Sequence, residues 1–331
     1  GPVMIVDTPG FDDVGTLGEL RIRKTRQVLN KTDIAVLIVD AVEGLPSADK
    51  ELLQLIKEKE IAHIVVFNKT DLIETHAEPA VDEIYVSALK GENIKELKER
   101  LGALVPNKEG KLAIVGDLIH PSAFVILVVP KGRLILPQQQ TIRDILEADA
   151  AAVVVKEYEL RDTLLNLGRK PALVITDSQV FAKVSADTPA DIPLTSFSIL
   201  MARHKGLLDA AVHGVAAVEN LRDGDWVLIA EGCTHHRQCD DIGTVKIPRW
   251  LRNYTGVDIS IETVSGVEFP DDLSPYAMVI HCGGCMLNER EVRYRMKCAL
   301  DQHVPITNYG ITIAYMQGIL KRSLGLFPYL A

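Results

Sequence analysis

The sequence predicts an α/β protein made of three successive α/β units with mainly parallel sheets. Short apolar runs without charges, such as residues 34–39 and 123–129, alternate with longer segments of helical periodicity. This alternation is typical of parallel sheets that helices cover on both faces. A chain of 331 residues has room for two or three domains. Polar motifs follow several of the apolar runs, at the strand ends where open parallel sheets bind ligands.

Composition narrows the class of function. Hydrophobic residues make up 47% of the chain and charged residues 24%, as in ordinary globular proteins. A net charge of −9 opposes nucleic-acid binding, which needs a basic face. Four of the five cysteines fall within 233–285, which favours a reduced, cytoplasmic metal site over a disulfide framework. We expect neither a signal peptide nor a membrane span, since no apolar run reaches about 18 residues.

The first unit, residues 1–107, opens with an expected buried strand over 3–6 that leads into the motif from Asp7 to Gly10. Asp-x-x-Gly after a strand is typical of GTPases. There the aspartate reaches Mg²⁺ through water, and the glycine amide meets the γ-phosphate. The motif alone is short and occurs often by chance, so it gains weight only when other GTPase motifs accompany it in the same unit.

Two further motifs of the same unit indicate guanine binding. The first contains Asn68, Lys69 and Asp71, and the second begins with Ser87 and Ala88. An aspartate carboxylate accepts hydrogen bonds from N1–H and the 2-amino group of guanine, whereas adenine offers no such pair of donors. The lysine stem covers the nucleotide, and the backbone of the second motif contacts guanine O6. Three motifs in this order predict a GTP and Mg²⁺ site.

The phosphate loop of GTPases, Gly-x4-Gly-Lys-Ser/Thr, does not occur in the 331 residues. Its amides and its lysine hold the nucleotide phosphates. We therefore expect that this chain by itself does not hydrolyse GTP, and that the complete protein does.

The second unit, residues 112–195, is predicted to alternate strands and helices without a catalytic constellation. A plain α/β layer of this kind is a candidate for subunit contact, so we expect a homodimer through it. Its predicted strands cover 123–129, 151–155 and 172–176, and its predicted helices cover 138–148, 157–168 and 178–185.

The third unit, residues 197–331, begins with an expected long helix over 197–221. Further strands are predicted over 225–230, 257–264 and 277–281, and helices over 241–253, 288–302 and 310–322. Two cysteine motifs follow the first and the last of these strands. Because the carboxyl ends of parallel strands share one edge, we expect the two motifs to meet.

Those motifs provide Cys233 and His235 on one loop and His281, Cys282 and Cys285 on the other. Thiolates are soft ligands that suit zinc, copper(I) or iron–sulfur centres. Structural zinc normally takes four protein ligands. Three cysteines without a clear fourth therefore favour a 4Fe–4S cluster that leaves one iron open. The alternative is that Cys282 and Cys285 are small buried residues at a strand end.

The ligand of the open iron stays undecided between several groups. Asp240 is favoured because a carboxylate is easily displaced from iron, and Asp241 is the next candidate. The alternative for both is capping of the following helix. His235 and His281 are expected to be supporting groups or exchangeable ligands. Cys239 would close the site as a fourth thiolate, while Cys298 is expected to be a core residue.

Together these motifs resemble the HydF family of FeFe-hydrogenase maturation GTPases. The resemblance is carried by Cys-x-His followed by His-Cys-x-x-Cys, with 45 residues between His235 and His281, and by the segments 6–10 and 306–310. It extends over the whole chain. It implies a homodimeric scaffold with a GTP-binding domain, a dimerisation domain and a cluster-binding domain. The family holds a 4Fe–4S cluster, carries a diiron precursor built with radical-SAM maturases, and delivers it to apo FeFe-hydrogenase.

A different class of function is a GTPase switch that acts in ribosome or tRNA metabolism and whose cysteines hold structural zinc. The negative net charge opposes it. A radical-SAM enzyme would need Cys-x3-Cys-x2-Cys, and this spacing does not occur in the sequence.

Overall fold

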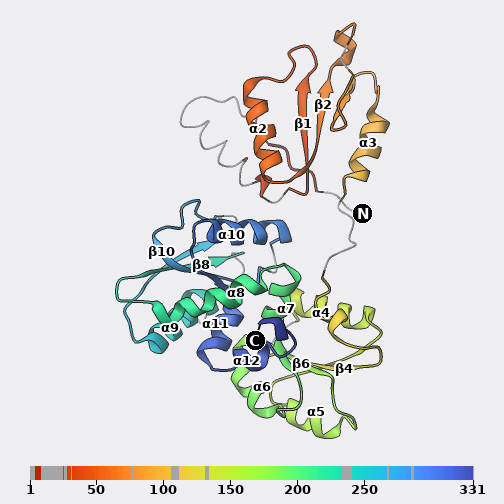
Figure 1. The fold of residues 1–331 in the computed structure, drawn as a ribbon. Coiled ribbons are helices and arrows are strands. Elements are labelled where there is room, and N and C mark those ends of the chain that lie inside the picture. Colours follow the sequence, from red (N-terminus) through yellow and green to blue (C-terminus); the bar gives the residue numbers. More distant parts are fainter. Residues whose placement is uncertain are drawn as a thin grey trace. The chain divides into compact units, whose positions relative to one another are not determined.

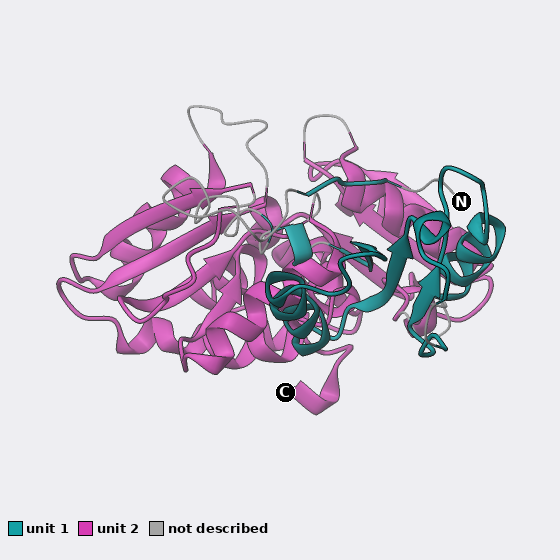
Figure 2. Cartoon of the chain, turned by 90° about the horizontal axis from the view of Figure 1, so that it is seen from above, with its two compact units in different colours: residues 1–110 teal, residues 111–331 magenta. Residues whose placement is uncertain are grey.

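The computed structural model describes residues 4–8, 25, 28–30, 32–75, 78–105, 112–130, 134–232, 241–266, 268–284 and 287–330. They belong to two compact units, residues 1–110 and 111–331 (Figures 1 and 2). The described strands form three sheets, and neighbouring strands in each sheet run parallel. The prediction of successive α/β units with mainly parallel sheets is therefore confirmed.

Unit 1 holds a sheet of order β1-β2-β3 between two helices. One face of the sheet packs with Leu52 and Ile56 of the first helix, and the other packs with Leu97 and Leu101 of the second. The first helix was not predicted from the sequence. The elements are β1 (Ile34–Asp40), α2 (Ser47–Glu58), β2 (Ala62–Asn68), β3 (Glu83–Tyr85) and α3 (Ile94–Ala103).

The strand predicted over residues 3–6 is wrong for the part that the structure describes. Met4, Ile5 and Val6 lie outside any strand, and their side chains are 87%, 90% and 56% exposed. An apolar run becomes a strand only where another strand satisfies its backbone groups, and none of the described strands pairs with these residues.

Unit 2 contains two four-stranded sheets that share one continuous core, in which Val125 of the first sheet and Val227 of the second both lie. The first sheet comprises β4 (Phe124–Val128), β5 (Ala151–Val155), β6 (Leu173–Thr176) and β7 (Leu194–Ser196). The second comprises β8 (Trp226–Glu231), β9 (Ser260–Ser265), β10 (Tyr276–His281) and β11 (Ile306–Asn308). The three-residue strands β7 and β11 were not predicted.

Helices cover both faces of these sheets. Ala299 of α10 packs on one face of β8 and β10, whereas Leu251 of α9 and Ile311 of α11 pack on the other (Figure 1). Among the described helices, none is long and apolar enough to cross a membrane. The helices of unit 2 are α4 (Leu136–Glu147), α5 (Leu160–Asn166), α6 (Phe181–Asp187), α7 (Phe197–His204), α8 (Leu208–Gly214), α9 (Ile247–Thr255), α10 (Glu289–Asp301), α11 (Tyr309–Met316) and α12 (Leu320–Ser323).

The single helix predicted over 197–221 is also wrong, because the chain breaks it after α7. Gly206 adopts a φ of +74°, and its amide donates to the carbonyl of Arg203. The amide of Leu207 donates to the carbonyl of Ala202, 2.8 Å away. These two bonds form the Schellman motif that ends many helices at a glycine. The chain restarts as α8, which leads into a 3₁₀ segment over Val215–Asn220.

The two sheets of unit 2 repeat one topology. Their strand orders are β5-β4-β6-β7 and β9-β8-β10-β11, so the first strand of each lies inside and the second and third flank it. The last strand and helix of each also share a sequence pattern, Leu-Thr-Ser-Phe-Ser-Ile over 194–199 and Ile-Thr-Asn-Tyr-Gly-Ile over 306–311. Both helices are capped alike: Ser196 accepts from the amide of Ile199, and Asn308 accepts from that of Ile311.

Equivalent residues of this repeat meet where α7 and α11 pack together. A Cβ atom on Gly310 would lie 2.3 Å from the Cβ of Ser198, the residue at the same place in the other copy. The amide group of Asn308 also donates to the carbonyl of Ser198, 3.2 Å away. The crossing therefore leaves room for one small side chain between the helices.

The outer strands of the two sheets differ in chemistry. β5 reads Ala-Ala-Val-Val-Val and ends its sheet, with Val154 42% exposed. Its counterpart β9 carries Glu262, whose carboxylate accepts from the hydroxyl of Tyr276 at 2.7 Å. An apolar edge strand without a charge is a template for pairing with another chain, whereas a charged edge resists it.

Candidate metal centre

The second sheet of unit 2 has its topological switch point between β8 and β10. β8 pairs with β9 on one side and with β10 on the other, and β10 pairs with β11. The connections after β8 and after β10 therefore leave toward opposite sides of the sheet. Ligands of open α/β sheets bind at the carboxyl ends of strands at such a point. Here these ends are Glu231 and His281, each directly followed by a cysteine-bearing loop.

The two loops meet at the sulfur of Cys282. Its Sγ accepts hydrogen bonds from the amides of Gly232 at 3.0 Å and Gly284 at 3.3 Å. Amides aimed at one sulfur favour its thiolate form. The approach requires a glycine, because a Cβ on Gly232 would lie 2.8 Å from the side chain of Leu287. Since Cys233 follows Gly232 in the chain, the predicted meeting of the motifs is consistent with this contact.

Most of the predicted ligands lie outside the described residues, namely Cys233, His235, Asp240 and Cys285, as does Cys239. Within the described ranges no three His, Cys, Asp or Glu side chains gather as a metal site. The donor set nevertheless fits a thiolate-bound centre, because the Cys282 sulfur accepts from the amide of Gly232, the residue before Cys233 in the sequence. Cys298 is half-buried and packs against the core, in line with its expected structural role.

His281 is buried, and both of its ring nitrogens are engaged. Nδ1 lies 2.6 Å from the carbonyl oxygen of Cys282, to which it donates, and Nε2 accepts from the guanidinium of Arg295 at 3.3 Å. This tautomer follows from the two partners. Burial lowers the pKa of His281 to about 3, and the positive charge of Arg295 acts in the same direction, so the ring is neutral. The geometry favours the supporting role over that of an exchangeable ligand.

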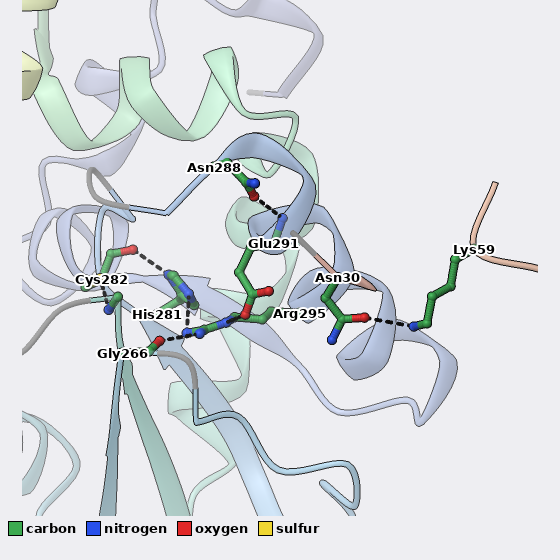
Figure 3. Close-up of polar contacts among 9 residues, drawn as sticks. Asn30, Lys59, Gly266, His281, Cys282, Asn288, Glu291 and Arg295 are labelled. Carbon is green, nitrogen blue, oxygen red and sulfur yellow. Dashed lines mark hydrogen bonds and ion pairs between the residues drawn. The ribbon is translucent and has the colours of Figure 1, made fainter. Parts of the chain in front are cut away.

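A buried ion pair lies beneath His281 and was not predicted. Arg295 is fully buried, and its Nε donates to Glu291 at 2.9 Å while Nη2 donates to the carbonyl of Gly266 at 2.6 Å (Figure 3). Asn288 caps α10 by accepting from the amide of Glu291. In the sequence, Glu and Arg four apart on a helix are typical of an exposed pair. Only the fold reveals that this pair is inside.

Asp241 serves as a helix cap. Its Oδ2 accepts from the amides of Gly243 and Thr244, each at 3.0 Å, at the start of a π-helical turn over Ile242–Lys246. This is the capping alternative considered for Asp241 in the sequence.

Glu231 is a buried carboxylate at the centre that the sequence analysis missed. It ends β8, and its Oε1 accepts from the hydroxyl of Tyr309 at 3.3 Å, while Oε2 lies 3.4 Å from the hydroxyl of Ser265. Burial, together with the nearby Cys282, Glu231 and Asp241, raises the pKa of Tyr309, so the phenol keeps its proton and donates it. The available signal was a glutamate that ends an apolar strand just before Gly232.

In unit 1 the structure brings the predicted guanine-reading residues together. Asn68 accepts from the amide of Ala88 at 3.0 Å, and Asp71 accepts from the hydroxyl of Ser87 at 2.6 Å. The Ser87 hydroxyl lowers the pKa of Asp71, which keeps the carboxylate ionised. The second motif thus holds the Asn68 and Asp71 side chains of the first.

Lys69 has a partner that sequence reasoning missed. Its ammonium lies 2.6 Å from Asp40 at the end of β1, which lowers the pKa of that carboxyl. Lys69 has a φ of +68°, a left-handed conformation that sets the turn after β2. Asp7 is exposed and belongs to no helix or strand, and Gly10 lies outside the described residues.

Three family models match the chain. The hydrogen maturase F dimerization domain matches residues 114–206, and the hydrogen maturase F tetramerization domain matches residues 209–326. A 50S ribosome-binding GTPase model matches residues 1–69. The two maturase models together cover both sheets of unit 2, and the GTPase model lies in unit 1.

Curated relatives also share part of the sequence. The chain is 32% identical over 106 residues to the tRNA modification GTPase MnmE of Streptococcus pneumoniae, covering 31% of this chain and 23% of that protein. It is 36% identical over 104 residues to MnmE of Aquifex aeolicus, covering 30% and 23%. It is 25% identical over 192 residues to GTPase Era of Thermotoga maritima, covering 54% and 62%. The chain thus spans less than two thirds of each relative.

The buried pair predicts a large loss of stability in Arg295→Met. The substitution leaves the Glu291 carboxylate buried without its cation, which costs about 3–5 kcal/mol in the free energy of unfolding. Urea unfolding followed by tryptophan fluorescence measures this, because Trp226 and Trp250, the only tryptophans in the chain, both lie in unit 2.

Arg293→Met is the matched control, since Arg293 pairs with Glu289 at the same spacing on the exposed side of α10. We expect it to cost at most about 0.5 kcal/mol. The double variant Arg295→Met/Glu291→Leu should recover part of the stability. Equal losses in the single and double variants would contradict the ion-pair interpretation.

Proposed function

Because the chain belongs to the hydrogen maturase F family, we propose that it is a scaffold and carrier in the maturation of FeFe-hydrogenase. It holds a 4Fe–4S cluster, receives a diiron precursor made with radical-SAM maturases, and delivers the precursor to the apo-hydrogenase. The contact between Gly232 and the sulfur of Cys282 carries the proposal, since it joins the two cysteine loops at a switch point.

Cys233, Cys282 and Cys285 hold the cluster in this proposal. Three thiolates leave one iron for an exchangeable ligand, which allows cargo to attach and leave. Asp240 is the preferred oxygen ligand from the sequence, and Glu231 is a second carboxylate at the same strand end. His281 orients the loop by donating to the carbonyl of Cys282.

Loss of the cluster in Cys282→Ser is the expected result of anaerobic reconstitution, because a cluster on three thiolates has no spare anchor. The measurements are iron and sulfide content, visible absorbance and the paramagnetic spectrum after reduction. Cys298→Ser is the matched control and should keep the cluster, since Cys298 lies in α10 among core residues.

Two outcomes would contradict the scaffold. A colourless parent protein with tightly bound zinc would support the GTPase switch of ribosome or tRNA metabolism instead. A cluster that survives Cys282→Ser would remove this sulfur from the ligand set. A separate comparison of Asp240→Asn with Glu231→Gln tests which carboxylate binds the open iron. Only the variant that lacks the true ligand should change the effect of added imidazole on the spectrum.

We also propose that unit 1 binds GTP with Mg²⁺ in the complete protein and regulates assembly or transfer of the cargo. The support is the preformed loop in which Ser87 and Ala88 hold Asp71 and Asn68. The match to a GTPase model over residues 1–69 points the same way.

Asp71→Asn in the complete protein should weaken GTP binding roughly tenfold to a hundredfold, because a carboxamide cannot accept from both guanine donors. Binding of xanthosine triphosphate should improve, since xanthine presents an acceptor where guanine has its amino group. Fluorescent nucleotide titration measures both, with the exposed Asp33→Asn as control. Unchanged preference for GTP would overturn the assignment.

Two copies of the chain are proposed to join through the edge strand β5. Among the described strands β5 pairs only with β4, so its other edge faces no strand beside the exposed Val154, and a symmetric dimer pairs two such edges. The match to a dimerization domain over 114–206 supports this.

Val154→Lys should weaken the dimer strongly, because pairing would bury or oppose two lysines across the dyad. Sedimentation velocity at several concentrations measures the dissociation constant. Leu165→Lys, on the exposed side of α5, is the matched control and should leave it unchanged. A Val154→Lys protein as dimeric as the parent would place the contact elsewhere.

A further inference from the structure

Lys205 reaches into the loop that carries the second pair of cysteines. The lysine is buried, and its ammonium donates to the carbonyl oxygens of Gly284, at short range, and of Leu287, at 3.0 Å. These two residues bracket Cys285 and its neighbour in the sequence. One cation therefore joins both ends of this short segment.

The backbone of Lys205 is held rigidly by the end of α7. Its amide donates to the carbonyl of Met201, and the Schellman motif at Gly206 fixes the next residues of the chain. Leu207, directly after the motif, is buried in the core of unit 2. Because the backbone at Lys205 is fixed, its side chain is held in one position, unlike that of a mobile surface lysine.

The residues just before Lys205 bind a different part of unit 2. Arg203 pairs with Asp117 and donates to the carbonyl of Ala113 at 3.0 Å. The ring of His204 lies 2.6 Å from the carbonyl of Leu112, close to the boundary at which unit 2 begins. One helix end thus contacts both the start of unit 2 and the loop of the metal centre.

Lys205 and its two hydrogen-bond partners belong to segments that match different family models. Lys205 belongs to the segment that matches the dimerization domain, whereas Gly284 and Leu287 belong to the segment that matches the tetramerization domain. Its hydrogen bonds therefore tie the first sheet of unit 2 to the cysteine loop of the second.

We propose that Lys205 is a positioning residue of the metal centre. It holds the carbonyls of Gly284 and Leu287, which stand on either side of Cys285 in the sequence, and its positive charge offsets the negative charge of the thiolates. This rests on the proposed cluster function. The charge and hydrogen bonds around an iron–sulfur centre set its reduction potential, and supporting residues orient its ligands. The first sheet, whose edge is proposed to form the dimer, thereby contributes directly to the centre.

The test compares Lys205→Met, which keeps the length of the side chain but removes its charge, with Lys205→Arg, which keeps the charge. Lys170→Met is the matched control, because Lys170 pairs with Asp191 on the surface of the same sheet. We expect Lys205→Met to retain less iron after reconstitution and to shift the midpoint potential of the remaining cluster to more negative values. Lys205→Arg should restore most of both, and Lys170→Met should change neither.

Hydrogen exchange in the metal-free protein gives a readout that needs no cluster. The amide of Leu287 donates to the carbonyl of Gly284 at 3.0 Å, and Lys205 holds both carbonyls. In Lys205→Met this amide should exchange at least tenfold faster. If the parent takes up no cluster, the proposed function fails while this measurement still tests Lys205.

Parent-like iron content, potential and exchange in Lys205→Met would overturn the proposal. A shift of equal size in Lys205→Arg would also overturn it, since the charge would then not matter. Should Lys205→Met fail to fold by tryptophan fluorescence, Lys205→Gln replaces it, because glutamine keeps one donor without a charge. The same changes are expected there, and their absence is decisive.

Discussion

The pairing of β8 with β10 is the constraint on which the candidate metal centre depends. Parallel strands end at one edge, and connections that leave toward opposite sides keep any helix from crossing over the two ends. The loops that follow Glu231 and His281 are thereby brought together although they are far apart in the sequence. The sulfur of Cys282 accepts hydrogen bonds from amides of both loops, so the protein backbone itself prepares the position of a thiolate.

Several charged side chains are buried near this edge of the sheet, although a packed core does not require charges. Arg295 and Lys205 bring cations into the interior, and Glu291 balances one of them. Burying ions costs several kcal/mol each unless they are paired and hydrogen-bonded, and well-packed apolar residues often replace a buried ion pair without loss of stability. Two buried cations thus accompany two buried carboxylates, since Glu231 ends β8 at the same edge. The neutral His281 joins Arg295 to the loop without adding another charge.

Much of the architecture could be predicted from the sequence because long apolar runs bounded by polar residues leave little choice of element. The strand predicted over 151–155 agrees with the structure residue for residue, and the apolar run over 34–39 lies within β1. Strands of three residues, such as β7 and β11, are too short to show a pattern. The break at Gly206 depends on one glycine in an apolar stretch, and the run over 3–6 has a strand pattern without a strand partner.

The residues of the two candidate sites also differ in how far the sequence reveals them. Spacing alone exposes the cysteine motifs and the guanine-reading motif, because their chemistry requires fixed residue types. The sequence did not predict the roles of Asp40, Glu231 and Arg295. Each is an ordinary charged residue whose partner lies far away along the chain or whose burial is decided only by the fold. The residues that surround a candidate site are thus harder to predict from sequence than the motifs that mark it.

The crossing of α7 and α11 has a consequence for how this protein tolerates change. Ser198 and Gly310 occupy the same place in two copies of one topology, and the space between them accepts a single hydroxymethyl group. Gly310 is the more constrained of the two, because a Cβ there would also lie 2.8 Å from the hydroxyl oxygen of Ser178. A larger residue at 310 therefore requires both serines to shrink or move. Unit 2 behaves at this point like a dimer interface folded into one chain, where the size that one residue can take depends on its counterpart.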